Sequence, residues 1–331
     1  MKRLIFFTGV VGLTFSVFGQ TKDSLKYQSD SIDIRYLYKI NDTLSYRYYP
    51  TRRFGFVSNA FKDFYLLPTE LVKKENFKGL GIIAASTAIL IYYDQELVDA
   101  AQRFGRYINL SGENNVYNLT GTKDLRINVP TDLSSGLYYI GDGITEMGVC
   151  AGFYIYSSFT DDKRAAQTAA QLAEGMLAVG AWIQILKHLT GHESPQCATV
   201  SGGRWRFFPN PVDYQNNVPK YDAYPSGHLA TAMMTATVVS MNYPEYKFIK
   251  PLCYTLMGLC GYQMMNNGVH WAGDYPLGIA IGYAVGRMAV NRGREEVKQP
   301  LTSIREPKAS FQLHPVYMPE GATGLALQVK F

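Results

Sequence analysis

Apolar segments about as long as a helix recur between residues 57 and 291, and this pattern limits the possible folds more than any other feature. Clusters of Gly, Pro and Asp separate the segments, as they do at the ends of helices. We therefore expect an all-α helical bundle. The predicted helices lie near residues 58–72, 80–107, 134–159, 163–189, 227–242, 247–265 and 272–291.

The segment between the fourth and fifth predicted helices, residues 190–225, is rich in Gly, Pro, Asn and aromatic residues. This composition predicts a long loop. Loops of that length in compact domains often carry function.

The first residues of the chain have the pattern of a signal peptide. Lys2 and Arg3 precede an apolar run that ends just before Gln20, so the predicted peptide spans residues 1–19. We therefore expect an exported protein of the periplasm or envelope.

The remaining sequence divides into three parts. Residues 20–56 are polar and predict an N-terminal arm that contains a short strand, and residues 57–292 form the helical domain. In the tail, residues 293–331, two alternating segments flank a Pro-Glu-Gly turn, which is typical of a β-hairpin.

The net charge and the lengths of the apolar stretches indicate which kinds of partner the protein has. The formal net charge is +5, and removing Lys2 and Arg3 leaves 30 basic against 27 acidic residues, too small an excess to indicate nucleic-acid binding. A membrane-spanning helix needs about 20 predominantly apolar residues. Most uncharged stretches here are shorter, for example the one between Lys78 and Asp94. These lengths favour a water-exposed or membrane-apposed bundle over an integral one, with a membrane surface as a partner.

The cysteines and carboxylates do not indicate a metal site or another cofactor. None of the four cysteines has metal-ligand spacing, and either a Cys150–Cys197 disulfide or free buried thiols fit the sequence. Asp142 and Glu146 lie four residues apart without a histidine at ligand spacing, so we interpret them as carboxylates at a helix start.

Four of the five histidines lie between His188 and His270, which indicates a common site. Asp274 follows His270 by four residues and can accept its ring N–H from the same helical face. His270 is therefore a candidate nucleophile. His228 follows a Pro-Ser-Gly turn at a predicted helix start and is a candidate general acid.

An anion site is predicted beside these histidines. Backbone amides near Ser226 and Gly227 lie at a helix N-terminus, where unsatisfied N–H groups and the positive end of the helix dipole attract anions. Lys187, at the end of the 163–189 helix, can add positive charge. A nucleophile, an acid and an anion site together indicate phosphoryl transfer.

In these residues the sequence resembles the type 2 phosphatidic acid phosphatase and vanadium haloperoxidase superfamily. Its motifs are K-x(6)-R-P, P-S-G-H and S-R-x(5)-H-x(3)-D. Lys187 begins the first motif and Pro195 ends it, residues 225–228 complete the second, and the third ends in His270 and Asp274.

The resemblance covers residues 130 to 292 and implies the helical bundle of that superfamily. It implies that His270 forms a phosphohistidine, that Asp274 orients it, and that His228 protonates the leaving oxygen. Lys187 and the amides near residues 226–227 would hold the phosphate.

Two departures from the motifs remove cations. Ser194 occupies the arginine position of the first motif, and Gln263-Met264 replaces the serine-arginine pair of the third. Arginine binds phosphate in a bidentate manner, so its loss weakens the site. We expect His192, and one of Arg204 and Arg206 from the long loop, to compensate by binding phosphate.

The predicted function is a metal-independent phosphatase that hydrolyses a phosphomonoester or diphosphate through phosphohistidine. A phosphorylated lipid is the favoured substrate, and a small soluble phosphomonoester is the other candidate. Vanadate-dependent halide oxidation is disfavoured by the missing arginines. The alternative to catalysis is a degenerate envelope protein that binds a phosphorylated lipid or glycan.

Overall fold

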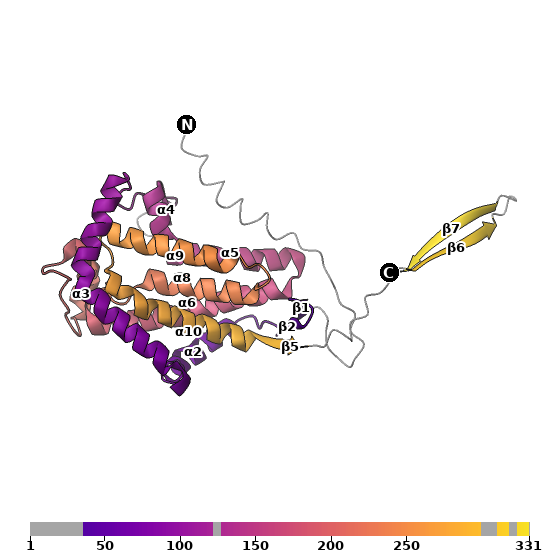
Figure 1. Cartoon of the computed structure of the whole chain (residues 1–331), viewed down its shortest axis with the longest axis horizontal. Helices are drawn as coiled ribbons and strands as arrows, with labels where there is room; N and C mark the ends of the chain where they lie inside the picture. The colour runs from indigo at the N-terminus through magenta and orange to yellow at the C-terminus, as the bar shows by residue number, and fades with distance from the viewer. Residues whose placement is uncertain (1–35, 122–126, 299–309, 318–322, 331) are drawn as a thin grey trace.

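The apolar segments of the chain form long helices that pack side by side in a computed structural model (Figure 1). The structure describes residues 36–121, 127–298, 310–317 and 323–330, so the predicted signal peptide lies outside it. The prediction of a helical bundle is confirmed. Its α-helices are α2 (Gly55–Leu71), α3 (Phe77–Tyr107), α4 (Leu133–Tyr139), α5 (Gly143–Thr160), α6 (Lys163–Thr190), α7 (Pro211–Asn216), α8 (Gly227–Asn242), α9 (Ile249–Asn266) and α10 (Tyr275–Gly293).

The prediction of one helix over residues 134–159 is wrong, because two helices form there. Asp142 caps the start of α5 by accepting a hydrogen bond from the Ile144 amide. Just before it, Gly141 lies so close to α8 that a Cβ atom would come within 2.5 Å of the His228 carbonyl oxygen. The break between α4 and α5 therefore allows the chain to pass closely beside His228.

Close packing of α8 against α10 aligns the two segments that carry the histidines. Gly278, Gly282 and Gly286 recur every four residues on α10, and each faces the α8 backbone. A Cβ atom at Gly282 would come within 2.1 Å of the Ala230 carbonyl oxygen. Helix α6 packs against both, and the three share an apolar core that includes Leu172, Val179, Met234, Ile281 and Val285.

A small sheet ties the N-terminal arm to the end of the last helix. Strands β1 (Leu37–Lys39), β2 (Leu44–Tyr48) and β5 (Arg294–Lys298) form one antiparallel sheet in the order β1-β2-β5. The described part of the arm is therefore more ordered than the single short strand that the sequence predicts. The Tyr48 hydroxyl donates to the Asn242 carbonyl at the end of α8, which anchors the sheet to the bundle.

Two hairpins complete the secondary structure. Strands β3 (Val116–Asn118) and β4 (Asn128–Pro130) pair beside α4. Strands β6 (Ser310–Tyr317) and β7 (Thr323–Lys330) form the antiparallel hairpin predicted for the tail.

The described residues contain one helix long and apolar enough to cross a membrane, α6. Within the bundle, 44% of its most apolar window is buried. All four cysteines are free, so the alternative of a Cys150–Cys197 disulfide is wrong for this structure.

Candidate active site

The histidine predicted as nucleophile is held by the predicted carboxylate. His270 and Asp274 are 2% and 0% exposed, and His270 Nδ1 lies 3.2 Å from Asp274 Oδ2. The same oxygen accepts a hydrogen bond of 2.8 Å from the Trp271 amide. A carboxylate acceptor at Nδ1 keeps the proton there and leaves the lone pair on Nε2. This is the tautomer that a nucleophilic histidine needs.

His228 faces His270 across a short gap between the starts of α8 and α10. The two ring centroids lie 6.2 Å apart, and the Tyr138 ring lies 4.4 Å from that of His228. Burial, with the positive charges of His270 and Lys187, lowers the pKa of His228 to about 3. His228 is therefore neutral at pH 7 while no anion is bound.

Lys187 lies at the end of α6, as predicted, and is only 7% exposed. Its Nζ lies 3.3 Å from Asp222 Oδ2, in the segment that leads into the Pro-Ser-Gly turn. The positive charge of Lys187 is one cause of the lowered pKa of His228. Asp222 thus holds a buried ammonium group next to the predicted anion site.

Ser226 does not have its predicted role as a hydrogen-bond donor to the anion. Its side chain caps α8 by accepting a 3.4 Å hydrogen bond from the Leu229 amide, and its own amide donates to the Asp274 carbonyl at 2.9 Å. The residue is fully buried, so both groups serve the protein rather than a ligand. The amides of Gly227 and His228 are the first of the helix and have no acceptor within α8.

His192 also differs from its predicted role. Its Nδ1 lies 3.1 Å from Asp274 Oδ1 and its Nε2 lies 3.1 Å from the Gly202 carbonyl oxygen, while its ring stacks on Trp205 at 3.9 Å. The residue is 0% exposed. Both ring nitrogens therefore face acceptors inside the protein, and the prediction that His192 binds phosphate is contradicted.

Two acceptors at one imidazole favour its doubly protonated form. Burial alone would lower the pKa of His192, but it is outweighed by the hydrogen bond and charge of Asp274, the Gly202 carbonyl and the charge of Asp94. The pKa is raised as a result. For Asp274, burial likewise opposes ionisation, and the hydrogen bonds from His192 and His270 lower the pKa of its carboxyl group.

We expect the raised pKa of His192 to make the protein less stable at alkaline pH. The folded state binds this proton more tightly than the unfolded chain, whose histidine pKa is about 6.5, so the stabilisation is complete below that pH. It is lost as the pH rises through the folded pKa, with a slope of at most about 1.4 kcal/mol per pH unit. The free energy of unfolding, measured with denaturant over a pH series, should show this loss as a pH-dependent difference between wild type and His192→Gln.

His188→Gln provides the matched control for this pH series. The His188 ring stacks on Tyr214 outside the site, and its Nδ1 lies 2.8 Å from the Gln184 carbonyl oxygen. A difference from wild type that stays constant with pH for His192→Gln, or that varies equally for His188→Gln, contradicts the assignment.

The two loop arginines differ in the partners of their side chains. Arg206 Nη1 lies 2.5 Å from Glu193 Oε1, a fully buried carboxylate that also accepts hydrogen bonds from the amides of Thr199 and Arg204. The Arg204 side chain is exposed. Within the described part of the chain, neither guanidinium makes a hydrogen bond or ion pair with His228 or His270. Arg206 is thus paired with Glu193, and the prediction that one of the two arginines binds phosphate stays a prediction.

At the two positions where the motif arginines are missing, the side chains present are buried in the protein interior. Ser194 is 1% exposed, and its amide donates to the Pro219 carbonyl. Met264 is fully buried in an apolar cluster with Leu229 and Cys260. Neither position leaves room for a cation, so Lys187 is the only one of the predicted phosphate-binding cations that lies beside the described histidines.

Two carboxylates near the site were not predicted to belong to it. Asp142 Oδ2 lies 4.0 Å from His228 Nε2, in addition to its capping role. Asp94 is a buried residue of α3 whose Oδ1 accepts a 2.8 Å hydrogen bond from the Gly273 amide. Burial and the charge of Asp274 raise the pKa of Asp94 to about 7. A lone carboxylate in an apolar helix, such as Asp94, was the available sequence signal.

The region that carries these residues matches a known protein family. The profile of the PAP2 superfamily matches residues 168–297, which include Lys187, His228, His270 and Asp274. A lipid A 1-phosphatase of Porphyromonas gingivalis is 37% identical over 71 residues, which is 20% of this chain and 15% of that relative. The chain thus matches only a small part of that protein.

One solved structure is also similar. The crystal structure of Aquifex aeolicus LpxE aligns with 48% of this chain and 83% of its own, at 20% identity and a TM-score of 0.36.

Proposed function

We propose, from the match of residues 168–297 to the PAP2 superfamily, that the protein is a phosphatase acting on a lipid phosphomonoester or diphosphate. The observation that carries the proposal is the pairing of His270 with Asp274 opposite His228. It supplies a nucleophile with a fixed tautomer and a second imidazole within one small site.

In the first step, His270 Nε2 attacks phosphorus while the bond from phosphorus to the leaving oxygen breaks. His228 gives a proton to that oxygen, so the alcohol or phosphate leaves in neutralised form. His228 is neutral before the substrate binds, and a bound phosphate anion favours its protonation. A phosphomonoester monoanion, whose second pKa is about 6, can bring this proton with it.

In the second step, water replaces His270 on phosphorus. Neutral His228 accepts a proton from the attacking water, the bond between phosphorus and Nε2 breaks, and inorganic phosphate leaves. Asp274 remains ionised throughout and stabilises the positive charge on His270 in both transition states. The lowered pKa of Asp274 supports this role.

The transferring phosphoryl group needs donors for its equatorial oxygens. Lys187 and the amides of Gly227 and His228 are the groups that we assign to this task. Because the positions of Ser194 and Met264 supply no cation, we expect weaker binding of the phosphoryl group than in a site with the complete motifs.

We assign His192 a positioning role behind Asp274. It donates to Oδ1 while His270 donates to Oδ2, so the carboxylate is fixed between two rings. Stacking on Trp205 and the bond to the Gly202 carbonyl fix His192 in turn. A fixed carboxylate holds the nucleophile in its productive orientation.

Two observations support a lipid substrate. Large apolar side chains are exposed along α3 and α5, among them Ile82 at 69%, Tyr92 at 77% and Phe159 at 87%. Patches of this kind on a protein surface mark interactions with membranes or other proteins. The similarity to a lipid A 1-phosphatase over 71 residues points in the same direction.

The purified protein is expected to release inorganic phosphate from lipid phosphomonoesters in detergent micelles, in the presence of a metal chelator. Phosphate released from a panel of lipid and soluble phosphomonoesters and diphosphates is the measurement. Faster release from the long-chain lipids than from soluble esters with the same leaving group supports the lipid assignment.

The competing function is binding of a phosphorylated lipid or glycan without turnover. It is supported if the protein binds a lipid phosphate and releases no phosphate from any compound in the panel. That result would overturn the proposed activity.

A further inference from the structure

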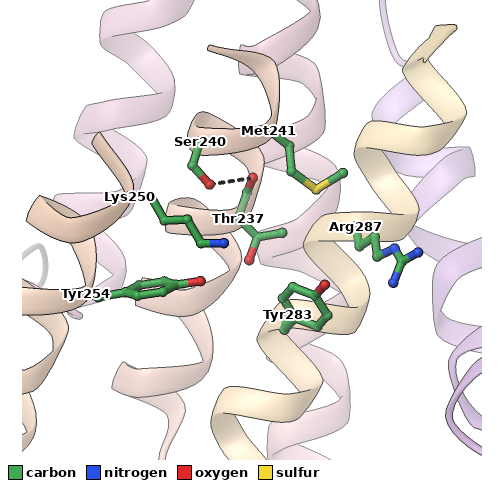
Figure 2. A pocket seen from close by; sticks show the side chains of 7 residues that line it. All are labelled: Thr237, Ser240, Met241, Lys250, Tyr254, Tyr283 and Arg287. Atoms are coloured by element: carbon green, nitrogen blue, oxygen red, sulfur yellow. Dashed lines mark hydrogen bonds between the residues drawn. The ribbon is translucent and has the colours of Figure 1, made fainter. Parts of the chain in front are cut away.

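A polar cavity lies along α8 and α10, away from the two histidines (Figure 2). Its volume is about 330 Å³, near the lower limit of small-molecule sites. Thr237 follows His228 by nine residues on the same helix, which separates them by about 14 Å along the axis. The residues that line the cavity are Thr237, Ser240, Met241, Lys250, Tyr254, Tyr283 and Arg287.

The lining has the composition of an anion site. It contains two cationic side chains and several hydroxyl groups, and no carboxylate. Figure 2 shows that Lys250 extends its amine toward Thr237 and above Tyr254, whose ring centroid lies 5.7 Å from Nζ, whereas Arg287 lies at the edge. Within residues 36–121 and 127–298, neither Lys250 nor Arg287 forms an ion pair. The cavity therefore carries positive charge that the neighbouring helices do not neutralise.

The position of Lys250 supplies a second, independent argument for an anion. Lys250 is the second residue of α9, whose first turn contains no acidic residue. A cation there lies against the positive end of the helix dipole, where a negative group is favoured instead. An anion bound beside Lys250 would relieve this repulsion and accept hydrogen bonds from the hydroxyl groups.

Two aromatic rings of the cavity lining are partly exposed. The Tyr254 and Tyr283 rings are 38% and 45% exposed. A small hydrophilic anion would leave these surfaces in water, whereas an amphiphile covers them. The rim therefore distinguishes a lipid from a free anion.

We propose that this cavity binds the phosphate of an acidic phospholipid, with the acyl chains against the exposed rings of Tyr254 on α9 and Tyr283 on α10. Lys250 pairs with the phosphate, the tyrosine hydroxyls donate to its oxygens, and Arg287 approaches from the rim. This site is separate from the histidines, and its ligand is a bound lipid rather than a substrate.

Binding of a soluble phosphodiester lipid tests the proposal without turnover by a monoesterase. We expect dihexanoyl phosphatidylglycerol, kept below its micellar concentration, to bind saturably to the full protein in a ³¹P NMR titration. Lys250→Gln should weaken this binding at least about tenfold, because it removes a charge-assisted hydrogen bond. Tyr283→Phe keeps the ring and should weaken binding by less, through loss of one neutral donor.

Lys247→Gln is the matched control, since Lys247 is an exposed lysine three residues earlier and does not line the cavity. Thermal unfolding by circular dichroism verifies that each variant is folded. Equal affinities of Lys250→Gln and Lys247→Gln would overturn the site. Inorganic phosphate that binds as tightly as the lipid would overturn the lipid assignment, and binding of zwitterionic dihexanoyl phosphatidylcholine with equal affinity would overturn the role of charge.

Discussion

Replacing His270 with Ala is expected to abolish the phosphoenzyme and to lower phosphate release by about 10⁴-fold or more, as removal of a catalytic nucleophile does. The wild-type protein, quenched during turnover, should carry phosphate in an acid-labile, alkali-stable linkage, as expected for a phosphoramidate. The reason is structural: Asp274 holds the Nδ1 proton of His270, so only Nε2 can attack phosphorus. Radiolabelled substrate followed by acid and alkali treatment of the trapped protein measures the adduct.

His188→Ala is the control for the loss of His270. The His188 ring stacks on Tyr214, and the residue takes no part in the pairing of His270 with Asp274. Its replacement should leave both the adduct and the turnover close to wild type. An undiminished adduct in His270→Ala would assign the nucleophile to another residue, and an acid-stable linkage would exclude phosphohistidine.

The helices could be predicted because their signal is local. Apolar residues at helical spacing mark one face of each helix, and Gly, Pro and Asp mark the ends. The predicted 227–242 segment matches α8 as observed. The separation of α4 from α5 was missed because it depends on the close approach of Gly141 to His228, 87 positions later in the chain. No local pattern encodes that contact.

The residues that we propose as catalytic could be identified from the sequence because their motifs are also local. His270 and Asp274 are four residues apart, so spacing alone brings their functional atoms together, whereas His228 is identified by its four-residue motif. The role of His192 was not predictable, because its partners are Asp274 and Gly202, from two other segments. From the sequence alone, a basic residue near a phosphate motif is predicted to bind phosphate. The structure is needed to show that a buried carboxylate lies beside it.

The loop arginines also show that contacts between distant segments cannot be predicted from local patterns. The sequence identifies Arg206 as a cation near the motifs, but its direction depends on Glu193, which is fully buried. A buried carboxylate without a cation is costly, so the ion pair stabilises the loop at the expense of the anion site. Although burial opposes ionisation, the amides of Thr199 and Arg204 and the side chain of Arg206 lower the pKa of Glu193 to about 2.

Replacing His228 with Ala is expected to lower turnover of an alkyl phosphate by about 10²- to 10⁴-fold, the usual contribution of a general acid. An aryl phosphate with an acidic leaving group needs little protonation and should lose much less. Steady-state rates on the two esters, with thermal unfolding to verify folding, give the comparison. Equal losses would show that His228 positions the substrate without donating a proton.

The pH dependence of the wild-type protein tests the same role independently. Because the pKa of His228 is lowered to about 3 in the free site, the imidazole has no proton to give before the substrate binds near neutral pH. If the monoanion of the ester supplies it, kcat/KM for the alkyl phosphate should fall as the pH rises above the second phosphate pKa of about 6. His228→Ala should remove this decrease while His188→Ala keeps it. The interval from about pH 5 to about pH 8 lies on both sides of the second phosphate pKa of about 6. A wild-type kcat/KM for the alkyl ester that stays constant over this interval would contradict proton delivery by the substrate.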